Sequence, residues 1–225
     1  MTTSTIPTTL SDLSGKYVID PAHTRIGFVA RHAMVTKVRG AFNEFEGSAV
    51  VDGIDFTKST GQLTIQAASI DTRNEQRDAH LRSNDFLAME EFPQITFVAT
   101  DLRQAGETTL ELTGDLTIRG VTNSVTIPFE FEGAATDPFG NLRVGFEGST
   151  VINRKDYGIT WNAALETGGV LVSDKITIEF EVSAIKPPDL QEPRPLSSGP
   201  VGHLTVPRTT SHPWNYPVSS TIFGD

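Results

Sequence analysis

The sequence predicts an all-β protein with one or two short helices, built from about eight strands. Polar and apolar residues alternate strictly through 109–119, 124–132 and 175–184. A period of two is typical of strands with one buried face. The chain offers no amphipathic helix long enough to cover such a sheet. The apolar faces are therefore expected to cover each other, either in a closed barrel or in a sandwich.

Length and charge narrow the class of protein further. A chain of 225 residues is expected to form one β domain with a single core, because barrels and sandwiches reach this size without dividing. It carries 18 Lys and Arg against 28 Asp and Glu, a formal net charge of -10, without basic runs. Nucleic acid is therefore not expected as a partner. There is no cysteine, so neither a disulfide framework nor a thiolate is available.

The predicted barrel domain spans 15–186. Residues 1–14 are rich in Thr and Ser and are expected to form a flexible leader. Residues 187–225 hold most of the chain's 13 prolines and are expected to form an extended or disordered tail. The first residues do not resemble a secretion signal, and no apolar stretch approaches the roughly 20 residues of a membrane-spanning helix. A soluble, cytoplasmic protein is expected.

The first strands are expected at 16–20, 24–32, 38–51 and 63–67. His32 falls on the apolar face of the second strand, together with Ile26 and Phe28. The third strand alternates poorly, since Phe42 and Phe45 have opposite parity. One inserted residue, as in a β-bulge, would produce this change.

A segment of helical character follows at 69–89, where Thr72 and Glu75 fit a capping box. The later strands are expected at 95–99, 109–119, 124–132, 142–152 and 175–184. These nine segments correspond to about eight barrel strands, a number that leaves a barrel interior just wide enough for one slender ligand.

The inward rows are predicted to line an apolar bore. Small members such as Ala30, Ala67, Gly114 and Gly148 leave room, unless larger side chains fill these gaps and make a solid core. A long, narrow bore suits a linear lipid, because each buried methylene contributes about 0.8 kcal/mol. Replacing Gly114 with Phe should then obstruct the bore and leave the fold largely intact. The predicted lining residues are Ile26, Phe28, His32, Phe42, Leu63, Ile65, Phe97, Leu110, Leu112, Gly114, Leu116, Val125, Ile127, Phe129, Phe131, Val144, Phe146, Ile178 and Phe180.

Four polar residues are candidates for a gate at the barrel mouth: Arg77, Asp78, His80 and Arg154. The first three lie in the helical segment and equally fit caps and ion pairs that tie a helix to strand ends. Turn chemistry explains the Asn, Asp and Gly residues of 153–158, which leaves Arg154 as the candidate for anion contact. His32 fits either a contact with the ligand's polar end or a neutral histidine bonded to a carbonyl.

A second hypothesis is an enzyme acting on a lipidic substrate, with His32, His80 and Asp78 as acid–base groups. The sequence has no G-x-S-x-G elbow and no cysteine nucleophile. His23, His32, Asp78 and His80 lack the compact spacing of a metal site. A binding protein without catalytic residues, metal or cofactor is therefore the favoured interpretation.

A set of motifs in order along 16–186 resembles the YceI-like polyisoprenoid-binding family. They are Tyr17-Val-Ile-Asp20 with His23-Thr24, Ser69-Ile-Asp-Thr72, Arg77-Asp-Ala-His80-Leu81, Asp85-Phe86, Pro93-Gln-Ile-Thr-Phe97, Gly114 to Val121 and Asn153 to Gly158. The resemblance implies an extended, lipocalin-like antiparallel eight-stranded β-barrel. It also implies that a long-chain lipid, such as a polyisoprenoid or an isoprenoid quinone, is the partner, with the protein as carrier, store or sensor. The sequence leaves open whether the protein forms a homodimer.

Overall fold

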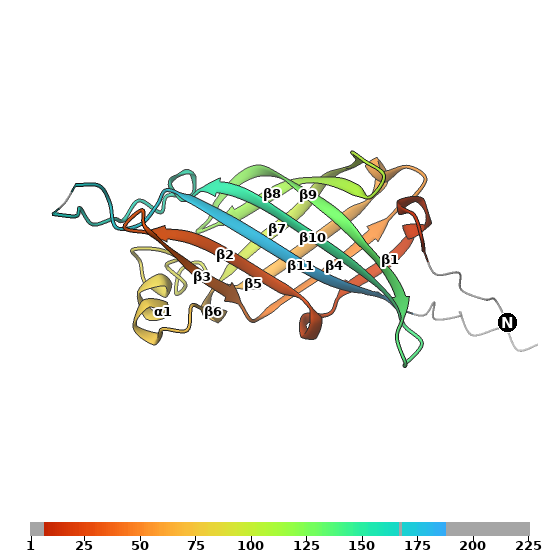
Figure 1. Ribbon diagram of the computed structural model, residues 1–225, viewed down its shortest axis with the longest axis horizontal. Coiled ribbons are helices and arrows are strands. Elements are labelled where there is room, and N and C mark those ends of the chain that lie inside the picture. The colour runs from red at the N-terminus through yellow and green to blue at the C-terminus, as the bar shows by residue number, and fades with distance from the viewer. Residues whose placement is uncertain (1–6, 167, 188–225) are drawn as a thin grey trace, which may run out of the picture. The chain divides into compact units, whose positions relative to one another are not determined.

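The computed structural model describes residues 7–166 and 168–187, which fold into a closed antiparallel barrel (Figure 1). Within these residues the sheet contains eleven strand segments. They are β1 (Gly15–Ile19), β2 (Arg25–His32), β3 (Thr36–Phe42), β4 (Phe45–Val51), β5 (Thr60–Gln66), β6 (Ile70–Asp71), β7 (Gln94–Gln104), β8 (Thr109–Ile118), β9 (Val121–Thr136), β10 (Leu142–Asn153) and β11 (Lys175–Lys186).

The eleven segments occupy eight positions around the barrel. β1 and β2 both pair with β11, so they act as one interrupted strand. In the same way β4 and β3 pair with β1 and β2, and β5 and β6 pair with β4 and β3. Pairing of β1 with both β4 and β11 closes the ring. The predicted eight-stranded antiparallel barrel is confirmed.

The three interruptions lie beside one another in the barrel wall. They fall at 20–24, at 43–44 and at 67–69. Asn43 N donates to Ser69 O (3.2 Å) and Gln66 N donates to Glu44 O (2.9 Å), so the second and third breaks are neighbours. The change of parity between Phe42 and Phe45 is therefore a break between two segments, and the expected β-bulge is wrong.

Short helices fill the connections between strands. The α-helix is α1 (Glu75–Arg82), and the 3-10 helices are η1 (Leu10–Leu13), η2 (Pro21–His23), η3 (Phe56–Lys58), η4 (Ala67–Ser69) and η5 (Arg154–Tyr157). The predicted capping box at Thr72 and Glu75 is wrong. Asn74 is the N-cap, and its side chain accepts from Arg77 N (2.9 Å). Thr72 lies before the helix, where its hydroxyl donates to Asp78.

The segment before β1 differs from the expected flexible leader. Leu10 and Leu13 on η1 are only 1% and 2% exposed, and they pack with Tyr17, Leu110 and Val144 at one end of the barrel. Apolar side chains three residues apart meet on one face of a 3-10 helix, which explains this burial. Residues 1–6, and the predicted tail apart from Pro187, lie outside the described residues.

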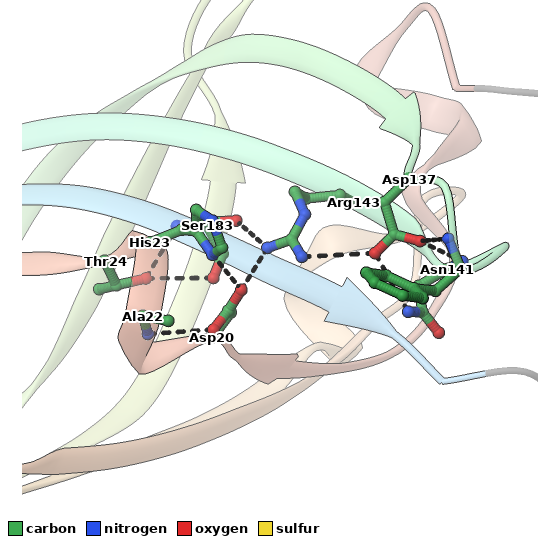
Figure 2. Close-up of polar contacts among 9 residues, drawn as sticks. Asp20, Ala22, His23, Thr24, Asp137, Asn141, Arg143 and Ser183 are labelled. Carbon is green, nitrogen blue, oxygen red and sulfur yellow. Dashed lines mark hydrogen bonds and ion pairs between the residues drawn. The ribbon is translucent and has the colours of Figure 1, made fainter.

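A polar network ties the corner after β1 to β10 and β11 (Figure 2). Arg143 Nη1 donates to Asp20 Oδ2 and to Ser183 Oγ (2.9 Å), and Nη2 donates to Asp137 Oδ2 (3.4 Å). Asp20 also accepts from Ala22 N (3.0 Å) and lies 2.7 Å from His23 Nδ1. The Arg143 guanidinium, helped by His23 and Ala22, lowers the pKa of Asp20 from 3.8 to about 2.

This network predicts a dependence of stability on pH. Because the pKa of Asp20 is lower in the folded state, its contribution is fully present above the unfolded value. It is lost as the pH falls from about 4 to about 2. The Asp20→Asn variant should therefore lose less stability than the parent protein over this interval, measured by urea unfolding. Asp115→Asn, an exposed position on β8, should follow the parent protein. Parallel curves for Asp20→Asn and the parent protein would contradict the assignment.

Candidate ligand-binding site

An apolar cavity of about 350 Å³ lies inside the barrel. All eight strand positions contribute to its wall, and most of the lining side chains are aliphatic or aromatic. This composition follows from the alternation of the strands, which turns every second side chain inward. The barrel interior is therefore hollow, and the alternative of a solid core, which the sequence also allowed, is wrong.

Most of the side chains predicted to line the bore do line this cavity. They are Ile26, Phe28, Phe42, Leu63, Ile65, Phe97, Leu110, Leu112, Leu116, Val125, Ile127, Phe129, Val144, Phe146, Ile178 and Phe180. Their contact with a ligand stays a prediction.

Three predicted residues lie away from the cavity wall. His32 is exposed at the end of β2, where its backbone pairs with Thr36 and bridges to Val172. The strand runs past the rim there, so the face that is inward lower down meets solvent. Phe131 packs on Phe146, with ring centroids 5.4 Å apart, in the apolar cluster near η1. Packing at that end of the barrel places Phe131 outside the lining.

Gly114 is the third exception, and its neighbour Phe97 is the cause. A Cβ on Gly114 would lie 2.6 Å from the carbonyl oxygen of Val98 and even closer to the Phe97 ring. Real Cβ atoms do not approach other atoms this closely. The space that the sequence suggested at Gly114 is filled by Phe97, so the expectation that Gly114→Phe leaves the fold largely intact is wrong.

Even the smallest substitution at Gly114 should destabilise the barrel. Gly114→Ala is expected to lower the free energy of unfolding by about 1 to 3 kcal/mol, because backbone or the Phe97 ring must shift. Gly61→Ala is the matched control: its Cβ would meet Ala49 and Ala99 at 3.6 and 3.7 Å, which are ordinary contacts. Urea unfolding of both variants tests this difference. Equal stabilities would show that the close approach at Gly114 is not limiting.

Small residues make room at another place in the wall. Ala49, Gly61 and Ala99 come from the neighbouring strands β4, β5 and β7, and all three line the cavity. Ala49 is the cross-strand partner of Gly61. The structure thus has a patch of small side chains where the sequence pointed to Gly114.

Three of the four predicted gate residues, Arg77, Asp78 and His80, lie on α1, which packs at the barrel end opposite η1 (Figure 1). Arg77 Nε and Nη2 donate to Thr72 Oγ1 (2.7 Å) and Thr72 O (2.8 Å). Asp78 accepts from Thr72 N (2.9 Å) and from Thr72 Oγ1 (2.5 Å). Neither Arg77 nor Asp78 lines the cavity, whereas Leu81 on the same helix does. These contacts fit the anchoring interpretation, in which the two residues tie α1 to the end of β6.

His80 belongs to an aromatic group beside the cavity. Its Nε2 lies 2.8 Å from Asp85 Oδ2, and its ring meets Phe86 and Trp161 edge-on at 5.0 and 4.6 Å between centroids. Phe86 lines the cavity and His80 does not. The structure therefore gives His80 a packing role in the cover of this end.

The residues proposed for catalysis or metal binding are not brought together. Neither the apolar cavity nor the polar depression beside α1 contains His32 or His80, and only the depression contains Asp78. Among residues 7–166 and 168–187, no three His, Cys, Asp or Glu side chains are grouped as metal ligands would be.

Arg154 lines the cavity but is held by backbone carbonyls. The residue is 3% exposed, its Nε donates to Ser173 O (3.0 Å), and its Nη1 donates to Ile159 O and Trp161 O (both 2.8 Å). Burial lowers the pKa of the guanidinium. Most of its donors are therefore engaged in joining η5 to the two following segments, and little remains for an anion.

The sequence reasoning missed two tyrosines. Tyr17 and Tyr157 line the cavity and are 5% and 2% exposed, and neither hydroxyl has a hydrogen-bond partner among the described residues. Burial raises the pKa of both phenols. Buried tyrosine hydroxyls normally find a partner. These two hydroxyls are thus buried polar groups in the cavity wall that lack a hydrogen-bond partner within the described part of the chain.

In the part of the chain that the structure describes, helices are too short or too polar to cross a bilayer.

Comparison with known proteins places this barrel in a family. A UPF0312 protein of Staphylococcus aureus (strain MSSA476) is 40% identical over 169 residues, which are 75% of this chain and 95% of that protein. The crystal structure of Burkholderia cenocepacia BcnA superposes with a TM-score of 0.65 at 25% identity, over 73% of this chain and 98% of BcnA.

A third relative is similar in fold. It is a polyisoprenoid binding domain from Saccharophagus degradans, with a TM-score of 0.59 at 15% identity, over 76% of this chain and 98% of that domain. The profile of the YceI-like domain matches residues 17–184. The closed barrel, its apolar interior and the matched motifs agree, and the chain belongs to the YceI-like domain family.

Proposed function

We propose that this protein binds a long-chain, predominantly apolar lipid, such as an isoprenoid, in the cavity of the barrel and carries it through water. The observation that supports this most directly is the cavity of about 350 Å³ lined by side chains from every strand position. An apolar cavity offers water few hydrogen bonds, whereas a hydrocarbon chain fills it with favourable contacts. The Saccharophagus degradans domain, which is described as polyisoprenoid binding, shares this fold.

Burial of the chain is expected to supply most of the affinity. Each methylene moved from water into the cavity contributes about 0.8 kcal/mol, and one hydrogen bond contributes about 1 kcal/mol net. The protein should therefore discriminate strongly by chain length and weakly by head group. The free hydroxyls of Tyr17 and Tyr157 are the polar contacts that we assign to the head group.

Native mass spectrometry tests the proposal directly. Protein purified without detergent should carry an adduct of lipid mass, and lipid-free protein should take up geranylgeraniol, a C20 isoprenoid alcohol, from solution. Farnesol, with a shorter chain, should bind more weakly. A bare protein mass with no uptake of either alcohol would overturn the proposal.

Tyr17→Phe should have opposite effects on stability and binding. Removing a buried hydroxyl without a partner is expected to raise the free energy of unfolding of the lipid-free protein by about 1 to 2 kcal/mol. If the hydroxyl bonds the alcohol group of geranylgeraniol, the same change lowers affinity roughly tenfold. Urea unfolding and titration measure the two effects. Tyr157→Phe removes the hydroxyl at the η5 end, so comparison of the two variants shows which end of the cavity receives the head group. A loss of stability in Tyr17→Phe would contradict the conclusion that its hydroxyl has no hydrogen-bond partner.

A further inference from the structure

The β2–β3 hairpin presents apolar side chains to solvent at its tip. Residues 33–35 connect the strands, and Met34 and Val35 are 55% and 78% exposed. Ala33 and Met34 both have positive φ, 49° and 59°, which is uncommon for residues other than glycine. The turn is nevertheless held in place, because Ala33 N donates to Leu171 O (2.7 Å). The fold therefore holds these apolar side chains in their exposed position.

Cations follow directly behind the tip. Arg31, Lys37 and Arg39 are exposed on the outward face of the hairpin, and Arg31 lies directly opposite Lys37 in the strand register. Like charges at this position destabilise a sheet. Among the described residues, no carboxylate lies within 4 Å of any of these three. Positions 24–43 contain no acidic residue, in a chain of net charge -10.

This combination is absent from the two most exposed large apolar side chains of the described residues, Ile54 and Phe139. Ile54 and Phe139 are 95% and 90% exposed, but Ile54 lies between Asp52 and Asp55, and Phe139 follows Asp137 by two residues. Both belong to loops at the end of the barrel near η1, away from the β2–β3 tip. The hairpin alone joins an exposed apolar tip to unpaired cations among these three sites.

We propose that the β2–β3 hairpin docks the protein onto a bilayer of anionic phospholipid. Met34 and Val35 enter the interface, and Arg31, Lys37 and Arg39 approach the lipid phosphates. Apolar insertion together with attraction between basic residues and anionic lipid is the physical basis of binding to a membrane surface. The net negative charge of the whole chain means that only a local basic surface can make this contact.

The position of the hairpin favours a bilayer over an acidic protein, and this step rests on the proposed function. The tip lies at the end of the barrel that α1 covers (Figure 1). Leu81, Phe86 and Leu87, which line the cavity from that cover, belong to the same end. Docking would bring the covered end of the cavity to the surface from which a lipid leaves the membrane.

Co-sedimentation with vesicles tests the docking surface on the full chain. Binding is expected to equimolar phosphatidylcholine and phosphatidylglycerol vesicles and not to phosphatidylcholine alone, and it should weaken as salt is raised. Lys37→Glu should lower the affinity for the anionic vesicles roughly tenfold or more, and Val35→Ser should also lower it. Phe139→Ser, a more exposed apolar residue at the other end, is the matched control and should bind like the parent protein.

Three outcomes would overturn the docking proposal. They are equal binding to both kinds of vesicle, unchanged binding of Lys37→Glu, and an equal loss in Phe139→Ser. Retention on polyglutamate without retention on anionic vesicles would overturn it in favour of an acidic protein partner. Because vesicle binding is measured without any lipid in the cavity, its failure is distinct from failure to take up geranylgeraniol, which concerns the proposed function.

Discussion

Ala99→Phe is expected to abolish most lipid uptake while the barrel stays folded. Ala99 lines the cavity beside Gly61 and Ala49, so the added phenyl ring extends into space that a lipid chain would use. Displacing about four methylenes of a bound chain removes about 3 kcal/mol of binding free energy, or roughly a hundredfold in affinity. The uptake of geranylgeraniol, followed by native mass spectrometry, measures the loss.

The neighbouring residue supplies the control for this variant. Val98 precedes Ala99 on β7 but points outward and is 51% exposed. Val98→Phe adds the same ring to the outer face and should leave uptake unchanged. An equal loss in both variants would show that the effect comes from the fold, and full uptake by Ala99→Phe would show that the lipid does not occupy this part of the cavity.

The Arg154→Leu variant is expected to lose about 3 to 5 kcal/mol of unfolding free energy. The buried guanidinium donates to three backbone carbonyls, those of Ser173, Ile159 and Trp161, at 2.8 to 3.0 Å. Leucine leaves these acceptors without partners, and a hydrogen bond to a charged group contributes about 1.5 to 3 kcal/mol. The loss of unfolding free energy is largest when the carbonyls left without a donor stay buried. Urea unfolding of the lipid-free protein measures it.

A surface arginine provides the comparison. Arg103 pairs with Asp101 at 2.5 Å, but its side chain is 71% exposed. Arg103→Leu should therefore change stability by no more than about 1 kcal/mol. If Arg154→Leu were equally mild, the carbonyl contacts would contribute little, and Arg154 would be free to serve a ligand.

Strand alternation predicted the barrel and most of its lining because side-chain direction in a strand depends on the local backbone alone. Alternation failed at positions where the direction of a side chain does not reveal what surrounds it. His32 has the parity of Phe28, but it lies past the rim. Gly114 is a small residue on an inward row, yet the ring of Phe97 from the adjacent strand takes its space. Both errors depend on neighbours that the sequence does not place.

Polar contacts were harder to predict than the lining. The sequence offered Arg77 and Asp78 as candidates for a gate, but their partner is Thr72, whose position depends on how α1 meets β6. The hydroxyls of Tyr17 and Tyr157 stand out because they lack a partner. A missing contact leaves no trace in the order of residues, so only coordinates reveal it.

The three neighbouring interruptions make the two sides of the barrel wall different. Five strand positions, β7 to β11, are uninterrupted strands, whereas the other three are interrupted at 20–24, 43–44 and 67–69. At the breaks, the regular ladder gives way to single contacts, such as Asn43 N to Ser69 O and Arg143 to Asp20. The shape of this side of the barrel therefore depends on a few local hydrogen bonds, whereas five long strands hold the other side.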